Sequence, residues 1–220
     1  MSNIIKYIKN ALTGKDKTST AVGKPQIKLP DVKFIEEKVI SANIGFIIDA
    51  TASRQHTWDT AREIQDKLFS DVDKEKNLSS RLVYYRGIKK PEDTGWRSNA
   101  GSIADMMQGV KCESGKTQIV DSLSLYTNDR KKANIVVLIG DCFEEEKEDA
   151  YEKAREMKKQ GTRIFVFHEN RSDLLGDSGT SAEEQRYIEQ MQHAEKVFRT
   201  LAEITGGTFQ RFDRKSSLEG

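Results

Sequence analysis

The stretch Ile44-Gly45-Phe46-Ile47-Ile48-Asp49-Ala50-Thr51-Ala52-Ser53 decides the fold of this chain. Its apolar run is too short for a helix and long enough for a buried strand, and it stops at a carboxylate that is followed by a hydroxyl at every second position. In parallel α/β sheets, ligands bind where strands end at their carboxyl side. Asp49, Thr51 and Ser53 offer only hard oxygen atoms, which suit Mg²⁺ or a similar cation better than zinc or copper.

Strand-like and helix-like segments alternate along the chain after this stretch. Strands are predicted at 44–48, 82–85, 135–139, 164–167 and 208–211, and apolar residues at helical spacing occur within 58–68, 103–110, 119–123, 150–157 and 187–201. Continuous Val and Ile runs are typical of strands that are covered on both faces. The sequence therefore predicts an α/β fold with a Rossmann-like, largely parallel central sheet and helices on both faces. Right-handed crossovers would place the carboxyl ends of its parallel strands on one edge.

Composition sets the domain organisation and narrows the function classes. We expect an N-terminal arm at residues 1–40, one domain at 41–213 and a C-terminal tail at 214–220. Charged residues make up 32% of the 220 residues and nearly cancel, with a formal net charge of +1, so a nucleic-acid partner is not expected. The chain has no membrane-spanning apolar run and no signal peptide, which predicts a cytoplasmic protein without a membrane partner. Cys112 and Cys142 are too few for a disulfide framework or a cysteine metal cage, so reduced thiols are expected.

A second carboxylate ends a second buried strand. Asp141 follows the apolar run 135–140 as Asp49 follows the first run, and on neighbouring strands the two carboxylates would converge. Each aspartate taken alone is equally compatible with a helix cap or a turn. The acidic run 144–149 is interpreted as the solvated start of the next helix, where the helix dipole favours negative charge.

A small-residue loop supplies a further hydroxyl at the start of a helix. Gly115-Lys116-Thr117 looks like the end of a phosphate-binding loop, but the first glycine of that motif would have to be at Val110, and no apolar strand precedes it. We therefore reject a nucleotide site here. Thr117 is either a plain helix cap or a ligand of the same ion as the two aspartates.

Asp49-x-Thr51-x-Ser53, Thr117 and Asp141, in this order, resemble the metal-ion-dependent adhesion site of von Willebrand factor A domains. The usual first motif is Asp-x-Ser-x-Ser, so Thr51 departs from it but keeps a hydroxyl. The resemblance covers about residues 40–213 and includes the closing segment 201–207. The segments 85–87, 117–119 and 140–141 with the glutamates after them also resemble a bacterial intracellular branch of this family.

The resemblance implies a site that binds and does not catalyse. In this family the residue matching Ser53, and one of those matching Thr51 and Thr117, bind the ion directly, while the two aspartates bind directly or through water. Mg²⁺, or Mn²⁺, would keep an exchangeable water that a Glu or Asp of a partner protein can replace. The residues expected to ring this edge and add specificity are Arg54, Trp96, Gln118 and the loop after Phe167.

Two other functions compete with this interpretation. A haloacid-dehalogenase-like phosphatase would use Asp49 as nucleophile, Asp141 with Glu144 or Glu145 for Mg²⁺, and Lys131 or Lys132 for phosphate. Such enzymes usually carry an acid two residues after the nucleophile, where this chain has Thr51, and they leave the hydroxyls unexplained. The other alternative is a scaffold of the same fold that binds partners without metal.

Overall fold

The computed structural model describes residues 42–54, 78–98, 101–169 and 181–212. The expected N-terminal arm, the expected C-terminal tail at 214–220, the helix expected within 58–68 and most of the loop after Phe167 lie outside these residues. No helix in the described part of the chain is long and apolar enough to cross a membrane.

Six strands form a single sheet in the order β3-β2-β1-β4-β5-β6. The strands are β1 Ala42–Asp49, β2 Leu78–Tyr85, β3 Glu92–Arg97, β4 Ile135–Gly140, β5 Arg163–Glu169 and β6 Phe209–Phe212. All neighbouring pairs are parallel except the β2 and β3 pair, which is antiparallel. The carboxyl ends of β1, β2, β4, β5 and β6 therefore lie on one edge of the sheet, as the sequence predicts.

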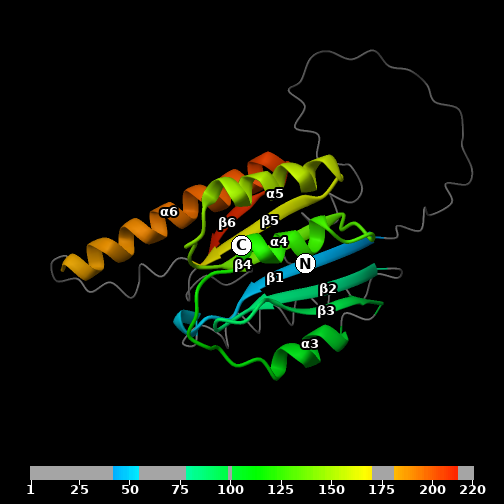
Figure 1. The fold of residues 1–220 in the computed structure, drawn as a ribbon, viewed down its shortest axis with the longest axis horizontal. Helices are drawn as coiled ribbons and strands as arrows, with labels where there is room; N and C mark the ends of the chain where they lie inside the picture. The colour runs from blue at the N-terminus through cyan, green and yellow to red at the C-terminus, as the bar shows by residue number, and fades with distance from the viewer. Residues whose placement is uncertain (1–41, 55–77, 99–100, 170–180, 213–220) are drawn as a thin grey trace, which may run out of the picture.

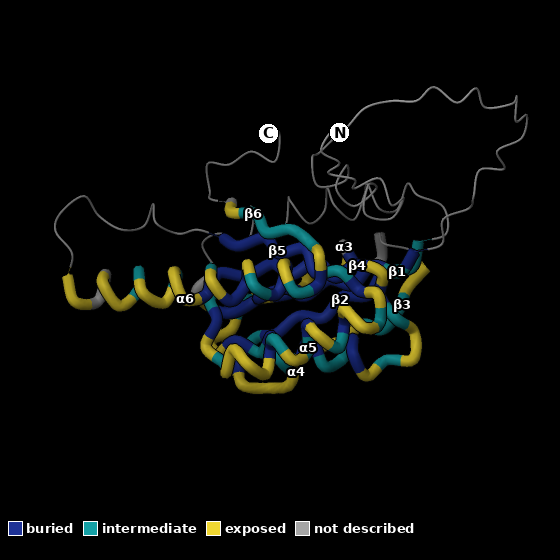
Figure 2. Tube along the Cα trace, turned by 90° about the horizontal axis from the view of Figure 1, so that it is seen from above, coloured by how far each residue is buried: buried dark blue, intermediate teal, exposed yellow. Residues whose placement is uncertain are grey.

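Helices cover both faces of this sheet (Figure 1). The helices are α3 Gly101–Gln108, α4 Ile119–Thr127, α5 Lys147–Lys159 and α6 Ala182–Thr205, with a short 3-10 helix, η1, at Ala52–Arg54. Apolar residues of α3 pack with Ile44, Phe46 and Ile48 on one face, and residues of α4, α5 and α6 pack with Ile47 on the other. The α/β fold with a largely parallel sheet and helices on both faces is confirmed. In Figure 2 the central strands β1, β4 and β5 are mostly buried, while the outer turns of α4 and α5 are exposed.

The middle of β1 shows why the sheet can pack so closely against α4. A Cβ atom at Gly45 would lie 2.4 Å from Cε1 of the buried Tyr126, so only glycine leaves room for this ring. The Tyr126 hydroxyl accepts a hydrogen bond from the Phe46 backbone N–H at 3.0 Å. It lies equally close to the Phe46 and Arg81 carbonyls, to which it can donate. This contact fixes α4 on β1, and α4 begins two residues after Thr117.

The interpretation of residues 91–98 as a loop, made because they show no strand pattern, is wrong, because they contain β3. This strand is polar, carries Gly95 at a φ of 65° and pairs with β2 across a register shift between Arg81 and Val83. It lies at the edge of the sheet, so it has no second strand and no continuous apolar run. Backbone pairing and the ion pair between Arg81 and Asp93 hold it in place.

Helix α6 ends at Thr205, directly before two glycines. Gly206 has a φ of 72°, and the N–H of Gly207 donates to the Ala202 carbonyl at 2.9 Å, which closes the last turn. A Cβ atom at Gly207 would lie 1.9 Å from the Ile164 carbonyl oxygen, so the chain passes β5 at a distance that only glycine permits.

Candidate functional site

The carboxylate of Asp49 lies at the end of β1 and is fully buried. Its Oδ1 accepts a hydrogen bond from the Thr51 N–H at 2.7 Å. Its Oδ2, also buried, accepts no hydrogen bond from the described residues. A buried carboxylate oxygen without a donor is costly in free energy, so this atom needs a cation or a proton.

Asp141 follows directly after β4, the strand beside β1, and is 2% exposed. A Cβ atom at Gly140 would lie 3.7 Å from the Asp49 Cβ and 3.6 Å from the Tyr85 hydroxyl, so both side chains border the end of β4. The expected convergence of the two strand ends is therefore present in the structure.

The two aspartates repel each other. Burial, together with the negative charge of Asp141, raises the pKa of Asp49 from 3.8 to about 7, although the Arg54 guanidinium and the Thr51 N–H act in the opposite direction. Burial and the same two carboxylates raise the pKa of Tyr85 well above its usual value. This corner of the protein therefore favours an additional positive charge.

His168 supports Asp141 from the neighbouring strand β5. Its Nε2 lies 3.0 Å from the Asp141 backbone carbonyl, which can only accept, so Nε2 carries the hydrogen. Burial lowers the pKa of His168, which favours the neutral ring. The neutral ring fixes the backbone at Asp141 without adding a charge that would balance the aspartates.

The first of the hydroxyls, that of Thr51, is brought to the same edge by a short bridge. Thr51 is buried and pairs in parallel with Glu113: the Ala52 N–H donates to the Glu113 carbonyl, and the Glu113 N–H donates to the Ala50 carbonyl. A Cβ atom at Gly115 would lie 1.8 Å from the Gly87 carbonyl oxygen, so the same loop also presses against the turn after β2. Ser53 lies in η1, directly after this bridge.

Thr117 is tied to the loop that follows Asp141. The Glu144 N–H donates to the Thr117 hydroxyl at 2.9 Å, and the Thr117 N–H donates to Oε2 of Glu144 at 3.1 Å. The hydroxyl oxygen uses one lone pair to accept this N–H, and its second lone pair can bind a metal ion. Thr117 therefore does not act as a plain cap through its hydroxyl, and the structure is compatible with its role as a ligand.

The interpretation of the acidic run as the solvated start of its own helix is wrong for Glu145, while Glu144 is exposed but also bonds to Thr117. Glu145 is half-buried and accepts from the N–H groups of Ile119 and Val120 at 2.6 and 2.9 Å. It thereby caps α4, whose own N-cap residue Gln118 makes no side-chain cap, and it does so from the loop before α5. Together the two glutamates clamp the segment that carries Thr117 to the segment that carries Asp141.

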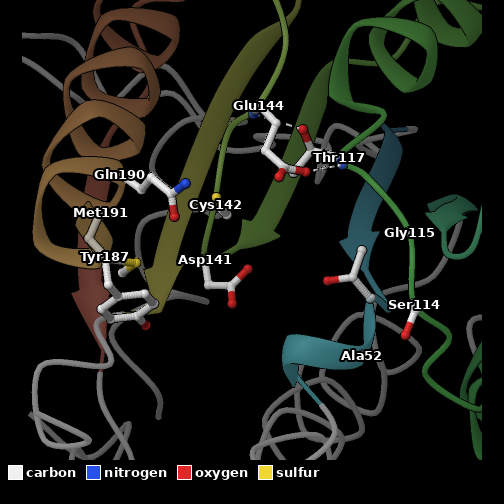
Figure 3. Close-up of a pocket in the computed structure, with 11 residues that line it drawn as sticks. Ala52, Ser114, Gly115, Thr117, Asp141, Cys142, Glu144, Tyr187, Gln190 and Met191 are labelled. Atoms are coloured by element: carbon white, nitrogen blue, oxygen red, sulfur yellow. Dashed lines mark hydrogen bonds between the residues drawn. The ribbon is translucent and has the colours of Figure 1, made fainter. Parts of the chain in front are cut away.

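A pocket of about 270 Å³ opens between these segments and α6 (Figure 3). It is lined by Thr51, Ala52, Ser114, Gly115, Thr117, Asp141, Cys142, Glu144, Tyr187, Gln190 and Met191. Three of the five predicted ligands thus share one pocket, while Asp49 is buried beside Asp141 at the end of the adjacent strand. The described residues contain no group of three or more His, Cys, Asp and Glu side chains that would hold an ion, so a metal here depends on hydroxyl oxygens as well.

Three of the residues expected to ring the edge have other roles. Arg54 is fully buried, forms a 2.9 Å ion pair with Glu169 and donates to the Asp49 backbone carbonyl at 3.1 Å. Trp96 pairs with Arg81 in mid-strand, away from the strand ends, and donates to Asp129. Gln118 is half-buried and donates to the Gly87 carbonyl at 3.5 Å, so it helps to join two loops at the edge. The side-chain partners Glu169 of Arg54 and Asp129 of Trp96, and the Gly87 carbonyl that Gln118 contacts, were not predicted, because each is distant in sequence.

The described residues do not assemble the phosphatase arrangement. Asp49 is fully buried and does not line the pocket, whereas a nucleophile must reach its substrate. Lys131 and Lys132 precede β4 and therefore lie at its amino end, where their ammonium groups donate to Ser79 and Thr127. The proposed nucleophile and the proposed phosphate-binding lysines thus lie at opposite edges of the sheet.

The two cysteines are free and half-buried. Burial raises the pKa of the Cys112 thiol to about 11 and that of Cys142 to about 12, so both are thiols at neutral pH. Cys142 lines the pocket beside Asp141, but a protonated thiol is a poor ligand for Mg²⁺.

Comparison with known proteins places this architecture. No protein-family model matches the sequence, and no curated protein sequence matches it. Among solved structures, it is similar to BatB from Bacteroides thetaiotaomicron (TM-score 0.57, 14% identity, covering 79% of this chain and 91% of that one). It is also similar to the SpRpn10 VWA domain (TM-score 0.54, 11% identity, 81% and 92% covered).

A third similar structure is described with a bound metal ion. Proximal thread matrix protein 1 from the mussel byssus, described with a zinc-occupied MIDAS motif, has a TM-score of 0.53 and 14% identity, with 78% of this chain and 41% of that chain covered. At such identities the similarity concerns the fold. Together with the sheet order and the helices on both faces, it shows that this chain contains a domain with the fold of von Willebrand factor A domains.

Proposed function

We propose that this protein is an interaction module that binds Mg²⁺ or Mn²⁺ at the end of β1 and β4 and uses the ion to bind a partner protein. The residues proposed to hold the ion are Asp49, Thr51, Ser53, Thr117 and Asp141. The observation that carries the proposal is the pair of buried aspartates at adjacent strand ends, one of which has an oxygen without a hydrogen-bond donor among the described residues.

The chemistry of this donor set fits a hard divalent cation. Carboxylate and hydroxyl oxygens are ligands that Mg²⁺ accepts, and Mg²⁺ usually keeps several waters when few protein carboxylates bind it. When bound, the ion would supply positive charge to the two aspartates and an exchangeable position for a further oxygen. The protein's own part is to orient these side chains, through the Thr51 N–H at Asp49 and the Glu144 N–H at Thr117.

The partner is proposed to fill that position with a Glu or Asp side chain. The pocket beside Asp141 is open enough to admit such a side chain. The similar structures include one named as a VWA domain and one with an occupied MIDAS motif, which supports an interaction module. Two unpaired cysteines agree with the cytoplasm, which we propose as its location.

A metal-free scaffold is the second candidate, and Arg54 favours it. Its buried guanidinium attracts both Asp49 and Asp141, so part of the charge that an ion would supply is already present. However, Arg54 is also neutralised by Glu169, and the pKa of Asp49 is raised in spite of it.

A capture experiment from the native host separates the two candidates. The full chain is immobilised and captures partners in Mg²⁺ or in chelator, alongside Asp141→Ala and the control Asp105→Ala, an exposed residue of α3. We expect a partner that is retained by the wild type and the control in Mg²⁺ and is lost with chelator or with Asp141→Ala. Capture that neither treatment changes would favour the metal-free scaffold.

A further inference from the structure

The walls of the pocket beside Asp141 differ in chemistry. One wall consists of Ser114 and Gly115 from the loop before α4, and the opposite wall consists of Tyr187, Gln190 and Met191 from α6, with Asp141 between them (Figure 3). The amino-terminal half of α6 projects beyond the carboxyl edge of the sheet (Figures 1 and 2), so this second wall stands beside the ends of the strands.

The charge of the pocket lining restricts which partner side chains can enter the pocket. Among the described residues that line the pocket, Asp141 and Glu144 carry carboxylates and none carries a positive charge. These carboxylates would repel the carboxylate of a partner unless a metal ion is present. The lining contains no lysine or arginine that could pair with it. The remaining contacts of the partner must come from neutral surface, to which α6 contributes Tyr187, Gln190 and Met191.

Size restricts the occupant further. A pocket of about 270 Å³ is below the roughly 300–1,000 Å³ that is usual for small-molecule sites. It has room for an acidic side chain and part of its neighbour. Met191 is half-buried in the wall, and methionine is an adaptable apolar contact that recurs at peptide-binding surfaces.

We infer that the partner presents its Glu or Asp next to an apolar side chain, and that this apolar side chain packs against Met191 of α6. This inference rests on the proposed metal-dependent function. It assigns a specificity role to α6, for which the apolar spacing within 187–201 predicts only a helix.

Two labelled peptides test the inference: Gly-Ser-Leu-Glu-Ser-Gly and the same peptide with Ser in place of Leu. Binding is measured by fluorescence anisotropy in Mg²⁺ and in chelator, for wild type, Met191→Ser and the control Met106→Ser. Met106 is a partly exposed methionine on α3, which packs on the opposite face of the sheet from α6. Mg²⁺ binding to each variant is measured separately by calorimetry.

We expect the Leu peptide to bind the wild type about tenfold more tightly than the Ser peptide, as for one partly buried apolar side chain. Met191→Ser should lose this preference while it keeps its Mg²⁺ affinity, and Met106→Ser should keep both. Equal affinity for the two peptides, or no binding of either by the Mg²⁺-loaded protein, would overturn the inference and leave the proposed metal site standing.

Two other results have different meanings. If the wild type binds no Mg²⁺, the proposed function fails, and this inference fails with it. If a peptide with Lys in place of Glu binds in chelator, the pocket takes a cationic side chain directly through Asp141 and Glu144, and the inferred acidic partner is wrong.

Discussion

Asp49→Asn should make the metal-free protein more stable at neutral and alkaline pH. The pKa of Asp49 rises from 3.8 to about 7 on folding, because the carboxyl is buried beside Asp141. Between these pH values the folded state binds more protons than the unfolded state, so the stability of the wild type falls as pH rises from about 4 to about 7. Asparagine keeps an oxygen for the Thr51 N–H and has no charge to lose.

The size of the effect follows from the pKa. A rise from 3.8 to about 7 corresponds to about 4 kcal/mol at pH 8, which is the most that removing this charge can recover. At pH 8 the chelator-treated Asp49→Asn variant should therefore be about 1–4 kcal/mol more stable than the wild type. At pH 4 the two should differ little, because Asp49 is then protonated in the folded state.

Urea denaturation of chelator-treated protein, from pH 4 to pH 8, measures this difference. Asp105→Asn, on the exposed side of α3, serves as the control and should follow the wild type at every pH. Adding Mg²⁺ at pH 8 should stabilise the wild type and leave Asp49→Asn unchanged. Parallel pH profiles for wild type and Asp49→Asn would refute the reasoning, since Asp49 would then carry no burial cost.

Two further substitutions test how the site is supported. Glu145→Gln should destabilise the protein by about 1–2 kcal/mol in urea and weaken Mg²⁺ binding, because Glu145 caps α4 next to Thr117, whereas the exposed neighbour variant Glu146→Gln should do neither. Tyr126→Phe should cost about 1–3 kcal/mol, because the buried hydroxyl serves the backbone of Phe46. An unfolding midpoint for Tyr126→Phe equal to that of the wild type would contradict the second prediction.

The central sheet was predictable because its strands are covered on both faces. β1 and β4 therefore read as continuous apolar runs, and the position of Asp49 and Asp141 follows from parallel strands that end on one edge. The strand β3 was not predictable in the same way. It is an exposed edge strand, and what fixes it is backbone pairing with β2 and not an apolar pattern.

The contacts that support the site could not be predicted from the sequence, for a different reason. Arg54 can be buried because Glu169, which lies 115 residues away in the sequence, pairs with it. No local sequence pattern indicates such a partner. Glu145 caps a helix 25 residues before it, although glutamates at this position usually favour their own helix. The one available signal was negative: Gln118, at the start of α4, is a poor cap, so the first N–H groups of this helix need an acceptor from elsewhere.

Calorimetric titration of Mg²⁺ and Mn²⁺ into chelator-treated protein tests the proposed site most directly. The wild type should bind one ion per chain, Asp49→Ala and Asp141→Ala should bind none while they remain folded, and Asp105→Ala should bind like the wild type. Failure of the wild type to bind either ion, or binding that both site variants retain, would contradict the proposal that the ends of β1 and β4 form a metal site.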